Sequence, residues 1–284
     1  MKKLTVIILV VALALSVFAL SSCAKPAGES AQGSAAAASG DFRVGLECNY
    51  APFNWTQTEE SDMTVPIDGG GGFADGYDVQ IAKKIAEGLG KNLVIVKTEW
   101  DGLIPAVTSG KIDAVIAGMS PTEERKASVD FSEPYYESEL VIVVKKDSSF
   151  AAAKSLADFS GAKITGQLNT FHYTVIDQIQ GVQKETAMET FPAMIVALQS
   201  GKIDGYISEL PGAVSAVASN PELAYVQFAE GSGFQTSQED VAVAVAVNKG
   251  NADLSKINEI LSGISKDDRL AMMNDAVARQ PVNE

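Results

Sequence analysis

Two stretches that share the pentapeptide Ser-Gly-Lys-Ile-Asp decide the architecture of this chain. Residues 103–113 read Leu-Ile-Pro-Ala-Val-Thr-Ser-Gly-Lys-Ile-Asp, and residues 194–204 read Met-Ile-Val-Ala-Leu-Gln-Ser-Gly-Lys-Ile-Asp. In both copies, apolar residues at helical spacing end at a glycine, a common helix terminator, and a short apolar run follows. A helix, a glycine stop and a buried strand make up half of a βαβ unit. The repeat therefore predicts two α/β lobes of similar build.

The other periodic segments fit two such lobes. Apolar and β-branched runs predict strands at residues 42–46, 93–96, 140–145 and 241–247, and amphipathic spacing predicts helices at 79–89 and 254–264. The last strand and helix follow the second repeat, and we expect them to return to the first lobe. The repeats are not phosphate-binding loops, because Pro105 and Val196 stand where that motif requires its first glycine.

The N-terminus has the pattern of an export signal. Two lysines at positions 2 and 3 precede an apolar run from Leu4 to Leu20, and the small residues Ser21 and Ser22 precede Cys23. We therefore expect residues 1–22 to be removed. The sequence Leu-Ser-Ser-Cys resembles the lipobox of bacterial lipoproteins, which implies acylation at Cys23, with palmitate, and a stable membrane anchor. An uncleaved anchor helix, or an ordinary signal with an incidental cysteine, are the alternatives.

Composition distinguishes a tether from the folded part and excludes several functions. Residues 23–40 are dominated by Ala, Ser and Gly, which predicts a flexible tether.

Removal of residues 1–22 takes away two lysines and no acid, so the formal charge changes from −14 to −16. Such a surface argues against nucleic acid and anionic membranes as partners. One histidine, His172, and no His/Cys cluster predict no metal site, and Cys48 has no expected disulfide partner.

Two loops after the repeat strands carry opposite charges. In open α/β sheets, ligands bind beyond the carboxyl ends of the strands. The loop 118–125 follows the first strand of the repeat and ends in Arg125, and the loop 208–212 follows the second and carries Glu209. An arginine fork binds a carboxylate, and a buried glutamate accepts hydrogen bonds from an ammonium. The pair predicts a cleft that binds a zwitterion from both lobes at once.

A series of short motifs runs through residues 41–284. They read Val-Gly-Leu-Glu-Cys-Asn-Tyr-Ala-Pro-Phe at 44–53, Gly-Tyr-Asp-Val at 76–79, Trp-Asp-Gly-Leu-Ile-Pro at 100–105, Gly-Lys-Ile-Asp at 110–113, Met-Ser-Pro-Thr-Glu-Glu-Arg at 119–125, Asp-Phe-Ser-Glu-Pro-Tyr-Tyr at 130–136, Gln-Leu-Asn-Thr at 167–170 and Asp-Gly-Tyr-Ile-Ser-Glu at 204–209. In this order the series resembles family 3 of the bacterial extracellular solute-binding proteins, the polar amino-acid receptors of ABC transporters.

The resemblance implies an α/β fold of the two-lobed, type II periplasmic-binding-protein class, with a hinge of two crossover strands. We expect lobe 1 to comprise residues 41–136 plus 238–284, and lobe 2 to comprise residues 137–237. The hinges are expected near residues 137–139 and 234–238.

The same resemblance implies a set of ligand-binding residues. They are Glu47, Tyr50, Trp100, Gly118, Met119, Ser120, Arg125, Gln167, Thr170 and Glu209. Arg125 would hold the ligand α-carboxylate, with help from Ser120, the Gly118 region and Thr170, and Glu209 would accept from the α-ammonium. Tyr50 and Trp100 would enclose the ligand side chain, and Glu47 would address its distal end. Asn169 stands where the family usually has glycine.

An aromatic pair beside Glu47 favours a cationic or flat side chain, so arginine, lysine or histidine is expected first and glutamine next. The resemblance implies an L-amino acid as ligand, a membrane permease as partner, no cofactor and a monomer. It also implies an extracytoplasmic protein, anchored through Cys23 to the cell membrane or facing a periplasm. Two alternatives are an enzyme of the same fold, dehydratase-like, with Glu47 and Glu209 as an acid/base pair, and a ligand-presenting sensor.

Overall fold

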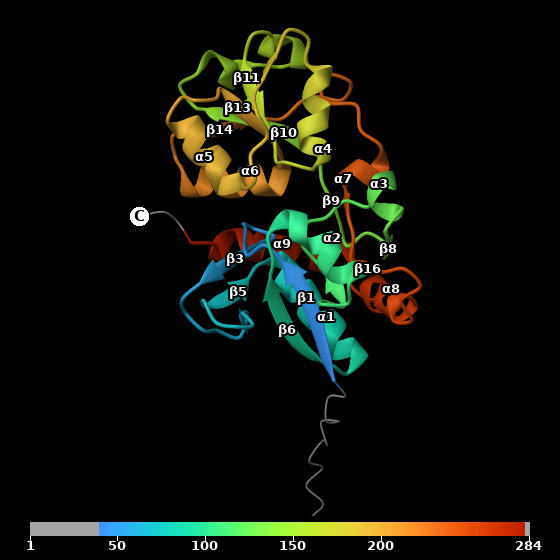
Figure 1. Ribbon diagram of the computed structural model, residues 1–284. Helices are drawn as coiled ribbons and strands as arrows, with labels where there is room; N and C mark the ends of the chain where they lie inside the picture. The colour runs from blue at the N-terminus through green and yellow to red at the C-terminus, as the bar shows by residue number, and fades with distance from the viewer. Residues whose placement is uncertain (1–39, 282–284) are drawn as a thin grey trace, which may run out of the picture. The chain divides into compact units, whose positions relative to one another are not determined.

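The computed structural model describes residues 40–281 (Figure 1). The expected signal peptide 1–22, the expected lipidation site Cys23 and all of the expected tether except Gly40 lie outside the described residues, as do residues 282–284. Within residues 40–281, no helix is both long enough and apolar enough to cross a bilayer.

The first of two five-stranded sheets has the order β6-β1-β7-β16-β8 (Figure 1). Its strands are β1 (Asp41–Leu46), β6 (Asn92–Lys97), β7 (Ala114–Val115), β8 (Val129–Phe131) and β16 (Ala246–Asn248). β1 runs parallel to β6 and β7, whereas β16 is antiparallel to β7 and β8. The returning strand β16 thus comes from the C-terminal part of the chain, as the sequence predicted.

The second sheet has the order β12-β11-β13-β10-β14 and repeats the pattern of the first. Its strands are β10 (Leu140–Lys145), β11 (Lys163–Thr165), β12 (Gln183–Lys184), β13 (Gly205–Glu209) and β14 (Leu223–Val226). β11 runs parallel to β12 and β13, and β10 is antiparallel to β13 and β14. Each sheet with its helices is one lobe, so the predicted two-lobed α/β fold is confirmed.

The Ser-Gly-Lys-Ile-Asp repeat plays the same structural part in each lobe. It joins α2 (Trp100–Thr108) to β7 in the first lobe, and α5 (Phe191–Gln199) to β13 in the second. Gly110 and Gly201 have φ of 74° and 75°, in the left-handed region that favours glycine. The carboxylate of Asp113 accepts from the Arg43 amide at 2.7 Å, and that of Asp204 accepts from the Lys163 amide at 2.8 Å. Each aspartate therefore ties the repeat to the parallel neighbour of the strand that follows it, β1 beside β7 and β11 beside β13.

A two-stranded antiparallel ladder joins the two lobes at the crossover. It consists of β9 (Tyr136–Glu137) and β15 (Ala242–Val243), with Ala242 opposite Glu137. The prediction of one strand over residues 241–247 was therefore wrong: the segment supplies β15 to this ladder and β16 to the first sheet. Between them the Ala244 amide donates to the Met119 carbonyl at 3.0 Å and the Val245 amide to the Ser132 hydroxyl. The whole run is apolar because it is buried in both settings.

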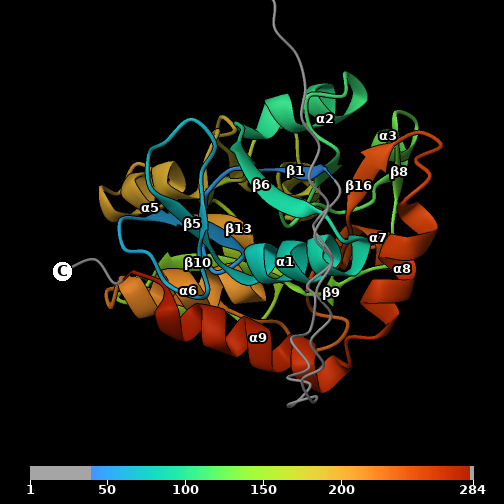
Figure 2. The same ribbon diagram turned by 90° about the horizontal axis from the view of Figure 1, so that it is seen from below.

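The helices cover the faces of the two sheets. In the first lobe they are α1 (Tyr77–Leu89), α2, α3 (Glu123–Lys126), α7 (Gln238–Val241), α8 (Leu254–Ser262) and α9 (Lys266–Arg279); in the second they are α4 (Phe171–Thr174), α5 and α6 (Leu210–Ser219), with 3-10 turns at Ser149–Ala152, Leu156–Phe159 and Val175–Gln178. α1 contacts both α8 and α9 (Figure 2). α5 and α6 lie between the second sheet and the first lobe (Figure 1).

Helix α1 illustrates why the sequence folds in this way. Ile81, Ala82, Ile85 and Ala86 form one buried stripe at helical spacing, and burial of each isoleucine contributes about 1.5–3 kcal/mol. The helix ends at Gly90, whose φ of 65° allows its amide to reach the last carbonyls.

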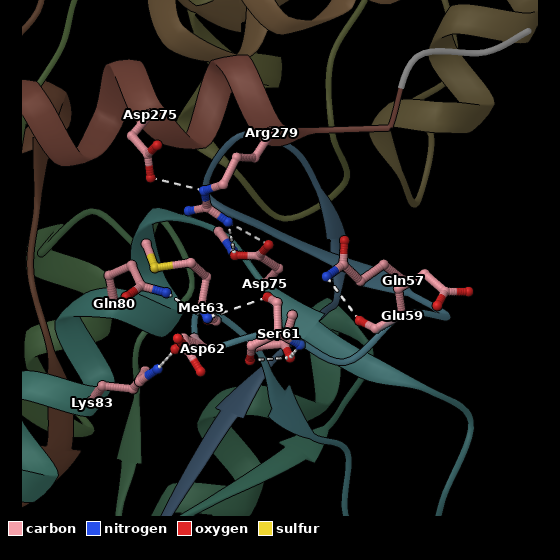
Figure 3. A network of polar contacts seen from close by, with 12 residues as sticks. Gln57, Glu59, Ser61, Asp62, Met63, Asp75, Gln80, Lys83, Asp275 and Arg279 are labelled. Atoms are coloured by element: carbon pink, nitrogen blue, oxygen red, sulfur yellow. Dashed lines mark hydrogen bonds and ion pairs between the residues drawn. The ribbon is translucent and has the colours of Figure 1, made fainter.

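The C-terminal helix α9 is fixed to a small four-stranded sheet of the first lobe. The sheet comprises β2 (Asn49–Tyr50), β3 (Asn54–Gln57), β4 (Val65–Pro66) and β5 (Phe73–Asp75), in the order β2-β3-β5-β4. Arg279 on α9 pairs with the buried carboxylate of Asp75 and with Asp275 (Figure 3). Its guanidinium also lies over the Trp55 ring. This attachment anchors the sheet whose strand β2 carries Tyr50, a residue of the candidate site.

Candidate ligand-binding site

Arg125 is placed at the cleft by the loop that follows β7. It lies on the short helix α3, whose first turn is capped by the Thr122 hydroxyl. One guanidinium nitrogen donates to the Ser120 carbonyl at 2.9 Å, and another donates to the Asn169 carbonyl of the second lobe at 3.3 Å. The guanidinium carbon lies 5.0 Å from the Trp100 ring centroid, a cation–π arrangement. Burial lowers the pKa of Arg125 to about 10, so the group stays charged at neutral pH and is held ready for an anion.

Glu209 ends strand β13 and enters the same region from the second lobe. Its Oε2 accepts a 2.7 Å hydrogen bond from the Tyr50 hydroxyl of the first lobe. Its Oε1 is buried and has no hydrogen-bond partner within residues 40–281. Burial raises the pKa of Glu209 to about 7, with the Tyr50 hydrogen bond acting in the opposite direction. A carboxylate in this setting is well suited to accept from a cation that brings its own donors.

Glu47 supplies a second buried carboxyl, from the first lobe. Gln167 of the second lobe donates to its Oε1 at 3.3 Å and also to the Glu189 carbonyl at 3.0 Å. Oε2 of Glu47 has no hydrogen-bond partner in the part of the chain that the structure describes, and burial raises the pKa of the group to about 8. Two buried carboxyl groups with a free oxygen each make the region a strong acceptor for cationic groups.

The backbone around these side chains takes two left-handed turns. Cys48, directly after Glu47, has φ of 57°, and Asn169, directly before Thr170, has φ of 55°. Asn is one of the few residues that adopt this region readily, so Asn169 keeps the turn that the family usually builds with glycine. Thr170 then donates to the Gln167 carbonyl at 2.8 Å. The turn fixes Thr170 beside the cavity.

A small cavity lies between the lobes beside these residues. Its volume of about 10 Å³ is about what one water molecule needs. It is lined by Tyr50, Trp100, Gly118, Ser120, Arg125, Gln167, Thr170, Phe171 and His172. A cavity of about 670 Å³ also has Tyr50 in its lining, but none of Arg125, Thr170 and Glu209. A third, of about 790 Å³, is lined by Trp100, Arg125 and Thr170, but by neither Tyr50 nor Gln167. Of these three cavities, the small one brings Tyr50, Arg125 and Gln167 together.

The chain matches a family of known proteins over most of its length. Residues 42–276 match the bacterial extracellular solute-binding proteins, family 3. The chain is a family 3 solute-binding protein. It is 35% identical over 195 residues to a probable histidine-binding protein of Campylobacter jejuni, covering 68% of this chain and 70% of the relative. It is 29% identical over 238 residues to the L-cystine-binding protein TcyJ of Escherichia coli, covering 83% and 82%.

A solved structure shares the fold of this solute-binding protein. It is an amino-acid ABC transporter substrate-binding protein from Streptococcus pneumoniae bound to L-arginine, with a TM-score of 0.70 and 27% identity. The alignment covers 84% of this chain and 94% of the other. The type II two-lobed fold predicted from the sequence is thereby confirmed.

In this family 3 protein, seven of the ten predicted ligand-binding residues line the small cavity. Glu47 and Glu209 do not line it, but each is hydrogen-bonded to a residue that does. Gln167 donates to Glu47, and Tyr50 donates to Glu209. Met119 does not line it: the side chain is buried and the carbonyl accepts from Ala244 near the hinge. The ligand contacts themselves stay predictions.

The aromatic residues are arranged differently from the expected pair. The Tyr50 ring stacks on Phe191 at 4.2 Å and on Phe53 at 5.0 Å, whereas Trp100 lies under Arg125. Both Tyr50 and Trp100 still line the cavity, so a ligand side chain between them stays a prediction. Gly118 permits this packing, because a Cβ there would lie 2.9 Å from the Tyr50 ring.

Sequence reasoning missed Phe171, His172 and Phe191. His172 lines the cavity, is 5% exposed and has its Nε2 3.9 Å from Oε1 of Glu209. Its position two residues after Thr170 was the only signal in the sequence. Phe191 could not be identified in this way, because it begins a helix that reads as an ordinary apolar segment.

Proposed function

We propose that this chain is the substrate-binding component of an amino-acid ABC importer, and that its lobes close on an α-amino acid. The observation that carries the proposal is the placement of Arg125 and Glu209. They enter the same region from different lobes, and Glu209 keeps a buried oxygen that no described residue satisfies. An α-amino acid has a carboxylate for the arginine fork and an ammonium for the glutamate. Such a ligand stabilises the closed state by linking both lobes.

A basic amino acid is the preferred ligand in this proposal, with glutamine next. The buried free oxygen of Glu47 offers a second acceptor, and Trp100 and Tyr50 offer aromatic faces to a cationic side chain. The relatives described above are named for histidine and L-cystine, and the solved structure holds L-arginine. Two of these three ligands are basic, in agreement with Glu47 as the distal acceptor.

Transport requires a membrane partner that recognises the closed conformation. We take lobe 1 as residues 41–136 plus 238–284 and lobe 2 as residues 137–237, closing as rigid bodies about the β9–β15 ladder. The closed monomer would present a surface to a permease, with the protein held outside the cytoplasm through lipid on Cys23. A Cys23→Ala variant, expressed in the native host, should then move from the membrane fraction to the soluble fraction. Retention in the membrane would rule out the lipid anchor.

A thermal-shift panel of the twenty amino acids tests the ligand proposal. A ligand raises stability in proportion to its binding to the native state, so 1 mM arginine, lysine or histidine should raise the Tm by about 5 °C or more. Aspartate and glutamate should leave it unchanged, because their side-chain carboxylates bring no hydrogen-bond donor to the buried free oxygen of Glu47. Stabilisation by acidic or apolar amino acids alone would overturn the basic preference. Recovery of the ligand unchanged after incubation separates binding from turnover by Glu47 and Glu209.

A further inference from the structure

The closed cleft buries polar atoms that nothing in the described part of the protein satisfies. They are Oε2 of Glu47, Oε1 of Glu209, and both ring nitrogens of His172. A buried polar group without a partner costs about 1–3 kcal/mol, so several in one place need a physical reason. In a binding protein whose lobes close on a solute, groups satisfied by that solute supply the reason.

Of the three residues with these unsatisfied atoms, His172 is the one to which the proposed function gives no role. It lies on α4, is 5% exposed, and lines the small cavity together with Arg125 and Thr170. Its ring packs at 4.5 Å from Phe171 and meets Phe191 edge-on at 6.1 Å. These aromatic neighbours hold the ring without using either nitrogen.

The distance between His172 and Glu209 fits a shared ammonium better than a direct hydrogen bond. Nε2 of His172 lies 3.9 Å from Oε1 of Glu209, beyond hydrogen-bond range. Two acceptors that each lie about 2.8 Å from one ammonium nitrogen are about 4.6 Å apart at the tetrahedral angle, and about 4 Å apart when the angle narrows to about 90°. The gap therefore has nearly the width that an ammonium bound to both atoms requires.

We propose that His172 contacts the ligand and, together with Glu209, holds its α-ammonium, with Nε2 as a neutral acceptor. The inference rests on the proposed function and adds to it a residue that favours ligands with an α-amino group over ligands that lack one. Burial, with a smaller contribution from the charge of Arg125, lowers the pKa of His172 to about 3. The ring is thus neutral at physiological pH and presents a lone pair rather than a repelling charge.

A matched pair of amide variants tests the contact without changing polarity or charge. The amide of His172→Gln reaches about as far as Nε2, whereas that of His172→Asn reaches only as far as Nδ1. Calorimetry should give a Kd for L-arginine within about threefold of wild type for His172→Gln, and a Kd about tenfold weaker or more for His172→Asn. His172→Phe, which keeps the ring packing, should lose as much as His172→Asn.

A ligand that lacks the α-amino group shows whether a loss of affinity comes from the contact with the ammonium. 5-Guanidinopentanoate is arginine without its α-ammonium, so His172→Phe should bind it within about threefold of wild type while losing about tenfold for L-arginine. Equal losses for the two ligands in any variant that folds would show that His172 is only structural, as would equal binding by the Gln and Asn variants. Wild-type protein that binds no amino acid would instead contradict the proposed function, and this inference with it.

Discussion

The hydroxyl of Tyr50 donates a 2.7 Å hydrogen bond to Oε2 of Glu209, across the cleft between the two lobes. The two residues are 159 positions apart in the chain and are 4% and 1% exposed. The bond closes the lobes by occupying the carboxylate that we assign to the ligand ammonium. Ligand-free closure and ligand binding therefore use the same carboxylate, through Oε2 and Oε1 respectively.

Tyr50→Phe should shift the ligand-free protein toward an open state. The variant keeps the stack on Phe191 but leaves Oε2 of Glu209 buried without a donor in the closed form, at a cost of about 1–3 kcal/mol. Small-angle scattering should give a larger radius of gyration for ligand-free Tyr50→Phe than for wild type, and saturating ligand should remove the difference. Tyr225→Phe, on β14, is the matched control. Identical ligand-free radii for all three proteins would show that the bond does not hold the lobes.

The ligand-free protein should lose stability as the pH rises from 6.5 to 8. Burial raises the pKa of Glu47 to about 8 and that of Glu209 to about 7, from an ordinary 4.5. In this window the folded state keeps protons that the unfolded chain has already released, so stability falls as the pH rises. His172, whose pKa is lowered by folding, makes stability rise with pH, and this effect falls mainly below its ordinary pKa of 6.5. The expected loss is about 2 kcal/mol.

Urea denaturation of wild type, Glu47→Gln and Glu87→Gln at pH 6.5 and 8 measures this effect. Glu47→Gln removes the larger of the two proton-linked groups and should flatten the dependence. Glu87 is exposed on α1, so its variant should follow wild type. The same slope in all three proteins would mean that Glu47 is ionised in the folded state.

The repeat predicts two equivalent stability effects that leave binding intact. Asp113→Ala removes the acceptor of the Arg43 amide, and Asp204→Ala removes that of the Lys163 amide. Each variant should lose about 1 kcal/mol in urea denaturation, with an unchanged Kd for ligand. Because both aspartates are remote from the cavity lining, a tenfold change in Kd for either would contradict the assignment.

The strands and the repeat were predictable because they depend on local patterns. The helix, glycine and strand of each repeat need only apolar spacing and one left-handed residue. The loops after β7 and β13 could be assigned to one cleft because the carboxyl ends of strands in such sheets face the ligand. These local rules were enough to identify Arg125 and Glu209.

The remaining features depend on contacts between segments far apart in the chain. The apolar run 241–247 gave no sign that it divides between two sheets, since both parts are equally buried. His172 looked like an isolated histidine until α4 placed it beside Glu209. No local pattern indicates that the Tyr50 hydroxyl spans the cleft, because that bond exists only when the lobes are closed.

Calorimetric titration with L-arginine of wild type, Arg125→Ala and Lys256→Ala tests the central claim most directly. Removal of a buried charged partner weakens binding by about 2–5 kcal/mol, or roughly 30-fold to several-thousandfold. Lys256 pairs with Glu259 on the surface of α8 and serves as the control. The account predicts one site per wild-type chain, unchanged binding by Lys256→Ala, and loss of at least about 100-fold for Arg125→Ala. Binding by Arg125→Ala as tight as wild type would contradict it.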